Sequence, residues 1–301
     1  MRKFILHTLL YLLPVILLVG SAEITLRTIP NNYRQKYQWM SSHSGDLEVL
    51  MLGNSHGLFG LRPDQFTQPT YNLCNVSQIF EYDEYLLNRF LPQCSHLHTV
   101  ILVCDHSNLF DPPLEESEAY RCTYYRLYMD YPKHSLLSSY GFEVSHIKAS
   151  GEKLTQWIQG RNESCDSLGF LPQEGLQRFP EEDADWGTVS ARQHCEQDTL
   201  YAYANREKLF QIAAHLQQEG IRLILVQTPV TEAYTRAIQA NWSWNDRFLR
   251  QTLETCHTRY GAIIEDFSTD PRFQAQDFSD ADHLSAQGGE KLSILLWDAI
   301  N

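Results

Sequence analysis

Apolar and polar positions alternate in blocks along most of the chain, and the block lengths predict its secondary structure. Four apolar runs have the length of buried strands and are bounded by Gly, Pro or polar residues. They are residues 47–52, 98–104, 221–227 and 262–265. Four further segments repeat apolar residues at three-four spacing, which predicts helices. These are residues 79–91, 199–219, 248–256 and 286–299.

Strands separated by helices favour a parallel sheet, because each crossover helix returns the chain to the edge where the next parallel strand begins. The order of the blocks predicts a three-layer α/β/α sandwich with a mostly parallel sheet over residues 46–301, and a weaker run at 70–74 is expected to add a minor strand. The alternation of predicted strands and helices stops over residues 109–197, which we expect to be an insertion lying over the strand ends. Its six tyrosines between 120 and 140 either stack on sugar rings or pack the insertion's own small core.

The amino-terminal segment has the pattern of an export signal or membrane anchor. Two basic residues precede Phe4–Gly20, a run of 17 residues without Asp, Glu, Lys or Arg. Apolar character resumes at Ile24–Leu26, so an uncleaved transmembrane helix within residues 1–30 is favoured over a cleaved signal or a buried core helix. Residues 31–45 are then expected to be a juxtamembrane linker, with the following domain outside the cytoplasm.

Composition narrows the possible functions. The chain has 301 residues, 43% hydrophobic and 20% charged, which suits one sizeable α/β domain with an insertion. Its formal charge of -13 argues against nucleic acid as a partner, because phosphate binding needs clustered Lys and Arg. The 12 histidines form no pair at metal-ligand spacing, and the 7 cysteines include no Cys-x-x-Cys. We therefore expect no metal and no cofactor.

Two distant stretches carry candidate chemistry. The run 47–52 ends in Gly-Asn-Ser-His-Gly, a sharp turn that places Ser55 at the carboxyl end of a strand, where open α/β sheets form their sites. Such a sequence can also be a turn and nothing more. A serine hydroxyl becomes a good nucleophile when a histidine takes its proton and a carboxylate orients that histidine. Asp280 and His283, three residues apart in one predicted loop, supply both groups.

The order of these residues decides between two hydrolase families. Gly-x-Ser-x-Gly also marks the nucleophile elbow of α/β-hydrolases, but there the serine lies mid-chain, and its acid and histidine come from separate loops. Here the serine follows the first strand, and acid and base share one loop near the far end. This arrangement resembles the SGNH (GDSL-like) hydrolase superfamily over about residues 46–300. The matching residues are Gly53-Asn54-Ser55-His56 and Asp280-x-x-His283, with weaker support from Asn75-x-Ser77-Gln78, Tyr82-Asp83 and Thr228-Pro229.

The resemblance implies an SGNH/flavodoxin-like fold, with Ser55 as nucleophile, His283 as general base and Asp280 as the residue that orients it. In such enzymes the oxyanion hole combines the serine N–H with a Gly and an Asn from two further loops. This chain has Ser77 near the first of these positions and lacks Gly-x-Asn-Asp at the second. A hole is expected from the Ser55 and Ser77 amides, with Gln78 or Asn108 donating as well.

Neighbouring residues leave alternatives open. His56 could contact substrate or make a structural hydrogen bond. Asp282 competes with Asp280 for the orienting role, although the resemblance favours the acid three residues before the base. Asp280, Asp282 and His283 could instead ligate a metal, but no further ligand motif completes such a site.

These residues predict a serine-dependent acyl-ester hydrolase or O-acyltransferase. More narrowly, the chain looks like membrane-anchored bacterial envelope proteins related to those that acylate exported polysaccharides and cell-wall polymers. The expected substrate is an acylated glycan or small acyl ester in the periplasm or at the cell surface. A transferase would also need an acyl donor, expected from a multispanning membrane partner. The alternative is a catalytically degenerate SGNH-fold module for glycan binding or assembly, which the altered oxyanion loops favour.

Overall fold

The computed structural model describes residues 1–135, 137–161, 164–180 and 185–301. Contacts among them divide the chain into two compact units. The smaller unit comprises Met1–Tyr37 and Leu114–Ser164, and the larger unit comprises Gln38–Pro113 and Cys165–Asn301. Of the expected insertion, residues 109–197, Leu114–Ser164 thus belongs to the same unit as the amino-terminal segment, and the other residues belong to the larger unit.

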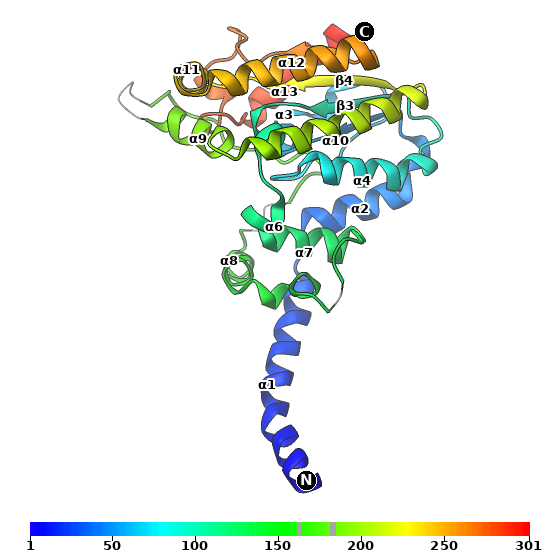
Figure 1. The fold of residues 1–301 in the computed structure, drawn as a ribbon, viewed down its shortest axis with the longest axis vertical. Coiled ribbons are helices and arrows are strands. Elements are labelled where there is room, and N and C mark those ends of the chain that lie inside the picture. The colour runs from blue at the N-terminus through cyan, green and yellow to red at the C-terminus, as the bar shows by residue number, and fades with distance from the viewer. Residues whose placement is uncertain (136, 162–163, 181–184) are drawn as a thin grey trace. The chain divides into compact units, whose positions relative to one another are not determined.

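The larger unit is built on a sheet that, in the described part of the chain, has five strands in the order β2-β1-β3-β4-β5. Figure 1 shows two of them, β3 and β4, side by side. Every neighbouring pair is parallel. The strands are β1 (Val49–Leu52), β2 (Thr70–Asn72), β3 (Thr99–Val103), β4 (Arg222–Gln227) and β5 (Ile263–Asp266). All four predicted strands are present, and the predicted minor strand is β2, which pairs with β1 at the edge of the sheet.

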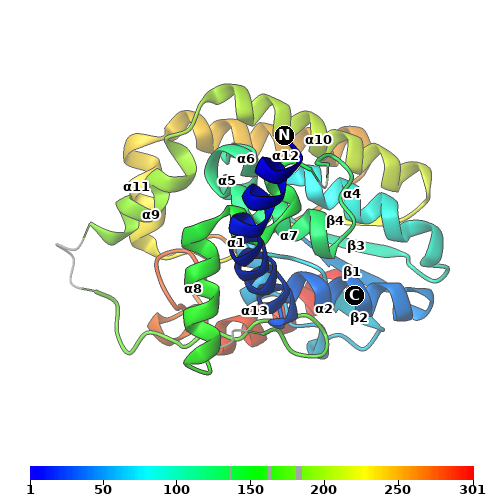
Figure 2. The same cartoon turned by 90° about the horizontal axis from the view of Figure 1, so that it is seen from below.

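Helices cover both faces of this sheet. The helices of the larger unit that follow β1 are α3 (Ser55–Gly60), α4 (Phe80–Phe90), α5 (His106–Phe110), α9 (Trp186–Cys195), α10 (Thr199–Gln218), α11 (Glu232–Asn241), α12 (Ser243–Tyr260) and α13 (Ala286–Ile300). Helix α10 packs between α4 and α12 on one face (Figure 2), whereas α3 and α13 pack together on the other. The predicted α/β/α sandwich with a parallel sheet is therefore confirmed.

The strands bury side chains on both faces, as a parallel sheet covered by helices requires. Val49 and Met51 of β1 and Ile101 of β3 share one core cluster with Leu292 and Leu296 of α13. Successive strand residues point to opposite faces, so the residues between them face the helices on the other side. This two-sided burial explains why the strands are continuous apolar runs in the sequence.

The segment after β1 forms a helix that the apolar pattern did not predict. Helix α3 is six residues long and contains two glycines, so it shows no amphipathic repeat. It begins at Ser55 because the Asn54 side-chain oxygen accepts the backbone N–H of His56 at 3.0 Å. The end of β1 and the start of α3 together place Ser55 at the carboxyl edge of the sheet.

Gly53 makes the turn between β1 and α3 possible. Its φ is +128°, and an added Cβ would lie 2.8 Å from the Val103 Cβ. A Gly53→Ala variant should therefore lose about 2–5 kcal/mol of unfolding free energy through backbone strain and overpacking. Gly220→Ala is the matched control, because Gly220 has φ +70° and open space around it. Urea unfolding of both variants tests this; an equal loss in the two would contradict the overpacking argument.

The smaller unit contains α1 (Arg2–Thr28), α6 (Leu114–Ser117), α7 (Ala119–Tyr128) and α8 (Ile147–Ile158), and α2 (Asn32–His43) begins in it. Tyr125, Tyr128 and Tyr131 are buried, and Tyr125 packs edge-on against Tyr33 with ring centroids 5.0 Å apart. These tyrosines pack the unit's own interior, which was one of the two alternatives for the tyrosine-rich segment.

Helix α1 includes one stretch, Leu10–Thr28, that is long and apolar enough to cross a bilayer, judged by length and composition. The predicted apolar amino-terminal helix is thus present, and both membrane anchors and signal sequences have such a helix. The expected linker, residues 31–45, is helical over Asn32–His43.

Candidate active site

The structure brings Ser55, His283 and Asp280 together in the larger unit. Ser55 is the first residue of α3, and the other two lie in the loop before α13. The Ser55 Oγ is 2.8 Å from the His283 Nε2. The His283 Nδ1 is 2.9 Å from Asp280 Oδ2 and 3.1 Å from Oδ1. A hydroxyl, an imidazole and a carboxylate are therefore aligned as nucleophile, base and orienting group.

The loop that carries His283 is held by its own hydrogen bonds. Asp280 Oδ1 accepts the backbone N–H groups of Asp282 at 3.1 Å and His283 at 2.8 Å. The Asp282 Oδ1 lies 3.7 Å from the His283 Nδ1, beyond hydrogen-bond distance. Of the two carboxylates, the one within hydrogen-bond distance of the His283 Nδ1 is therefore that of Asp280.

The three side chains differ in exposure. Ser55 is 9% exposed, whereas the side chain of His283 is 20% exposed and that of Asp280 is 53% exposed. The His283 ring packs against Phe59 and His56, with ring centroids 5.3 Å and 4.8 Å away. Ring contacts thus hold the imidazole in place, and exposure to solvent increases from Ser55 through His283 to Asp280.

The backbone N–H groups of Ser55 and Ser77 have no hydrogen-bond acceptor in the part of the chain that the structure describes. Ser77 has φ +56°, and its turn is tied to the Gly53 turn by a hydrogen bond from the Asn75 N–H to the Gly53 carbonyl at 3.2 Å. These amides are the two that the sequence suggested for an oxyanion hole.

The side chains of Gln78 and Asn108 have other functions, which corrects the expectation that either donates to an oxyanion. Gln78 Nε2 donates to Asp83 Oδ1 at 2.6 Å, and Asn108 Nδ2 donates to the Val103 carbonyl at 2.5 Å. Both residues are fully buried. Asn108 also completes a capping box with Asp105 at the start of α5. These amides hold the turns after the strands.

Asp83 is a buried carboxylate beneath the nucleophile turn. Its Oδ1 accepts the Gly53 N–H at 3.0 Å as well as the Gln78 amide. Burial raises the pKa of Asp83 to about 7, and these two hydrogen bonds offset only part of the rise. Because the folded-state pKa lies above the unfolded value, the native state holds this proton between about pH 4 and pH 7. Stability is therefore lost as pH rises through that window.

An Asp83→Asn variant should remove this pH dependence. The Asn oxygen can still accept from Gly53 and Gln78, but it carries no charge. The difference in unfolding free energy between the variant and the unmodified chain should shift by about 2–3 kcal/mol in favour of the variant from pH 5 to pH 8. Urea unfolding at both pH values measures the difference; a constant difference would show that Asp83 does not titrate in this range.

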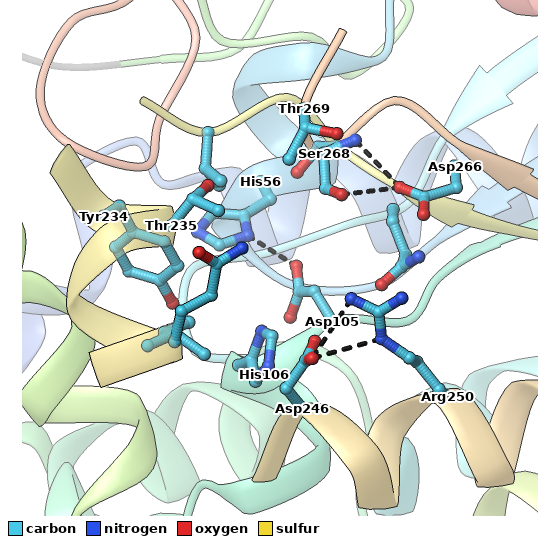
Figure 3. A pocket seen from close by; sticks show the side chains of 15 residues that line it. His56, Asp105, His106, Tyr234, Thr235, Asp246, Arg250, Asp266, Ser268 and Thr269 are labelled. Atoms are coloured by element: carbon cyan, nitrogen blue, oxygen red, sulfur yellow. Dashed lines mark hydrogen bonds and ion pairs between the residues drawn. The ribbon is translucent and has the colours of Figure 1, made fainter. Parts of the chain in front are cut away.

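A second cluster of ionisable side chains lies beside the triad. His56 Nδ1 is 2.5 Å from Asp105 Oδ2, and its Nε2 is 3.3 Å from Asp282 Oδ2. His194 Nε2 is 3.2 Å from the same Asp282 oxygen, and its Nδ1 is 3.3 Å from Asp111 Oδ1. Figure 3 shows the His56 ring directed at Asp105. Two imidazoles thus share one carboxylate, and each has a second carboxylate of its own.

Charge interactions within this cluster oppose the effect of burial. Burial alone would lower the pKa of His56, but Asp105 and Asp282 raise it to about 10. Burial likewise disfavours the His194 cation, yet Asp111 and Asp282 hold its pKa well above the usual value. For both rings, the neighbouring carboxylates favour the protonated form.

Both ring nitrogens of His56 make contacts within the fold, in line with the structural alternative of the two that the sequence left open for this residue. His56 is 2% exposed, and both its ring nitrogens face carboxylates. Sequence reasoning missed Asp111 and His194 entirely. His194 comes from α9, within the expected insertion, and no motif there marked it.

A cavity of about 80 Å³, lined in part by His56 and Asp105, lies near the ends of β4 and β5 (Figure 3). Its lining includes His106, Tyr234, Asp246 and Arg250, but neither Ser55 nor His283. Burial lowers the pKa of His106 to about 4, so this ring is neutral. The cavity is therefore distinct from the space next to the nucleophile.

The known proteins that match the chain are found among solved structures. No family model and no curated protein match the chain. Among solved structures, it is similar to a Streptococcus pneumonia protein provisionally described as a platelet activating factor, with 12% identity and a TM-score of 0.42 over 97% of this chain and 99% of that one. It is also similar to the native and inhibitor-bound M. smegmatis aryl esterase, with 10% and 9% identity and a TM-score of 0.34 over 84% of this chain and 98% of each. At this level of similarity, function must be argued from the site itself.

Proposed function

We propose that the chain is a serine-dependent acyl-ester hydrolase or O-acyltransferase that forms an acyl-enzyme on Ser55. The observation that carries this proposal is the 2.8 Å distance from the Ser55 Oγ to the His283 Nε2, with Asp280 on the opposite side of the ring. Asp280 next to Nδ1 favours the tautomer with its proton there, which leaves the Nε2 lone pair facing the hydroxyl.

Each step of the proposed reaction uses groups at this site. The Ser55 Oγ bonds to the acyl carbon while His283 Nε2 takes its proton, and the N–H groups of Ser55 and Ser77 donate to the oxyanion. The ester bond then breaks, and His283 gives the proton to the departing alcohol. Water or a sugar hydroxyl next loses its proton to His283 and attacks the acyl carbon. The bond between that carbon and the Ser55 Oγ then breaks, the acid or the new ester departs, and His283 returns the proton to Oγ.

A fluorophosphonate probe tests the nucleophile directly. The purified chain should be labelled at neutral pH, and a Ser55→Ala variant should not. Ser243→Ala is the matched control, because Ser243 is an exposed serine at the start of α12. Circular dichroism establishes that each variant is folded. No labelling of the folded unmodified chain would overturn the proposal.

The proposed substrate is an acylated glycan of a bacterial envelope, reached from an anchored position outside the cytoplasm. The apolar helix α1 and the envelope branch that the motifs resemble support this location. Glu23 near the end of α1 accepts the backbone N–H groups of Glu143 and Val144, and Arg27 donates to the Gly141 carbonyl. Since the end of α1 belongs to the folded unit, we propose that the helix is retained. Amino-terminal sequencing of exported protein that began at Glu23 would contradict retention.

Hydrolysis and transfer differ in what attacks the acyl-enzyme. For transfer, we propose that a multispanning membrane protein supplies the acyl group, because acyl carriers are cytoplasmic. Incubation with p-nitrophenyl acetate and an oligosaccharide separates the two reactions: free acetate alone indicates hydrolysis, and an acetylated sugar indicates transfer.

One observation favours a second candidate, a glycan-binding or assembly module without efficient chemistry. The Gln78 and Asn108 amides are already used within the fold, so the third oxyanion donor expected from these loops is missing. Loss of one such donor typically costs about 3 kcal/mol of transition-state stabilisation. This loss slows an esterase without changing its reaction, so we favour the enzyme; failure of probe labelling would favour the binding module.

A further inference from the structure

The side chains of His56, His194 and Asp282 converge next to the triad. One ligand atom from each lies within 4.8 Å of the other two. We propose that these three residues bind a divalent transition metal ion, with zinc as the ion that fits best. Two imidazole nitrogens and one carboxylate oxygen are a common zinc ligand set, with a water molecule in the fourth position.

The distances fit metal ligands better than they fit hydrogen bonds. Charge-assisted hydrogen bonds between imidazolium and carboxylate are about 2.7–2.9 Å long. The two Nε2 atoms instead lie 3.3 Å and 3.2 Å from Asp282 Oδ2. Ligands bound tetrahedrally at about 2.0 Å from a zinc ion are about 3.3 Å from one another. The distance from Asp282 Oδ2 to each Nε2 therefore matches the distance between two ligand atoms of a tetrahedral zinc site.

The other atoms of these side chains are held as metal sites require. A metal-binding histidine usually donates its second ring N–H to a carboxylate, which fixes the ring and its tautomer. His56 Nδ1 faces Asp105 and His194 Nδ1 faces Asp111 in this way. Asp282 Oδ1 accepts the Ser190 hydroxyl at 2.5 Å, which leaves Oδ2 directed at the two rings. Both imidazoles thus present Nε2 to the same point.

The charge of the cluster also suits a cation. Three carboxylates, those of Asp105, Asp111 and Asp282, surround the two rings. Their negative charges favour a cation bound between the rings.

A different ligand set, Asp280 with Asp282 and His283, is also close enough to hold a metal. His283 has no ring nitrogen to spare for it, because Nε2 faces Ser55 and Nδ1 faces Asp280. The set with His56 and His194 leaves these triad contacts intact.

The position of the site indicates what the metal does. His56 lies in α3, His194 in α9 and Asp282 in the loop before α13, so one ion would join three segments that are distant in sequence. His56 follows Ser55 directly, and Asp282 directly precedes His283. The ion would fix the position of Ser55 relative to His283 and would take no part in the reaction steps.

Metal binding to the full chain in detergent tests this proposal. After removal of metals with a chelator, the chain should bind one equivalent of Zn²⁺ by calorimetry, and one of Co²⁺ with the visible absorption of a tetrahedral site. His194→Ala and Asp282→Asn should each lose that equivalent. Asp111→Asn should keep the stoichiometry with about 10- to 100-fold weaker affinity, because Asp111 only orients His194.

Two further variants make the outcome specific. His215→Ala removes a histidine on α10 that pairs with Glu219, outside the cluster, and should bind zinc as the unmodified chain does. Ser55→Ala should also bind normally, so zinc binding without probe labelling would overturn the proposed reaction alone. If the folded, unmodified chain binds no zinc, or if folded His194→Ala retains the full equivalent, the metal site is overturned whatever the activity.

Discussion

A His283→Ala variant is expected to lower acyl-ester turnover by about 10⁴- to 10⁶-fold. His283 Nε2 is 2.8 Å from the Ser55 Oγ, and an alanine there leaves the hydroxyl without the base that takes its proton. In serine proteases, loss of the histidine alone costs about as much as loss of the whole triad. Initial rates with p-nitrophenyl acetate measure the change, together with the rate of fluorophosphonate labelling.

If Ser55 and His283 act in one step, the decreases in rate caused by the two single substitutions should not add. A double variant, Ser55→Ala with His283→Ala, should be no slower than either single variant, because each alone disables the same step. His215→Ala is the matched control for a histidine outside the site and should keep the unmodified rate. If folded His283→Ala keeps a rate within tenfold of the unmodified chain, His283 is not the base.

The fold was predictable because parallel strands leave a strong signal. Strands buried on both faces are continuous apolar runs, and β1, β3, β4 and β5 all lie within predicted runs. Helix α3 gave no such signal, since its short sequence depends on the cap from Asn54 and on contacts with α13. The division of residues 109–197 between two units also left no trace in the pattern, because contacts distant in sequence determine it.

The candidate site was predictable where topology alone determines proximity. Ser55 follows the first strand and His283 precedes the last helix, and a parallel sheet brings such positions to one edge. Gln78 and Asn108 were expected there for the same reason, but the partner of a side chain depends on rotamer and local backbone. Both turn inward to satisfy buried groups. His194 depends on how α9 packs against α11, which no local pattern encodes.

An Asp280→Asn variant is expected to lower kcat by about 10²- to 10⁴-fold with little change in KM. The Asn oxygen can still accept the backbone N–H groups of Asp282 and His283, so the loop should keep its shape. The change removes the negative charge that stabilises the imidazolium formed during proton transfer, and an amide N–H can favour the wrong tautomer. The Asp280 side chain is 53% exposed, and solvent screening places the expected loss below that for His283.

Steady-state kinetics with p-nitrophenyl acetate separate this role from a structural one. An unfolded or distorted loop would change KM and lower the melting temperature, whereas loss of orientation lowers kcat in a chain that melts normally. Asp298→Asn, an exposed position on α13, is the matched control and should change neither. If Asp280→Asn keeps kcat within threefold, the orienting role must belong to Asp282, the other carboxylate near this ring. Its Oδ1 would then have to close the 3.7 Å gap to His283 Nδ1 when substrate binds.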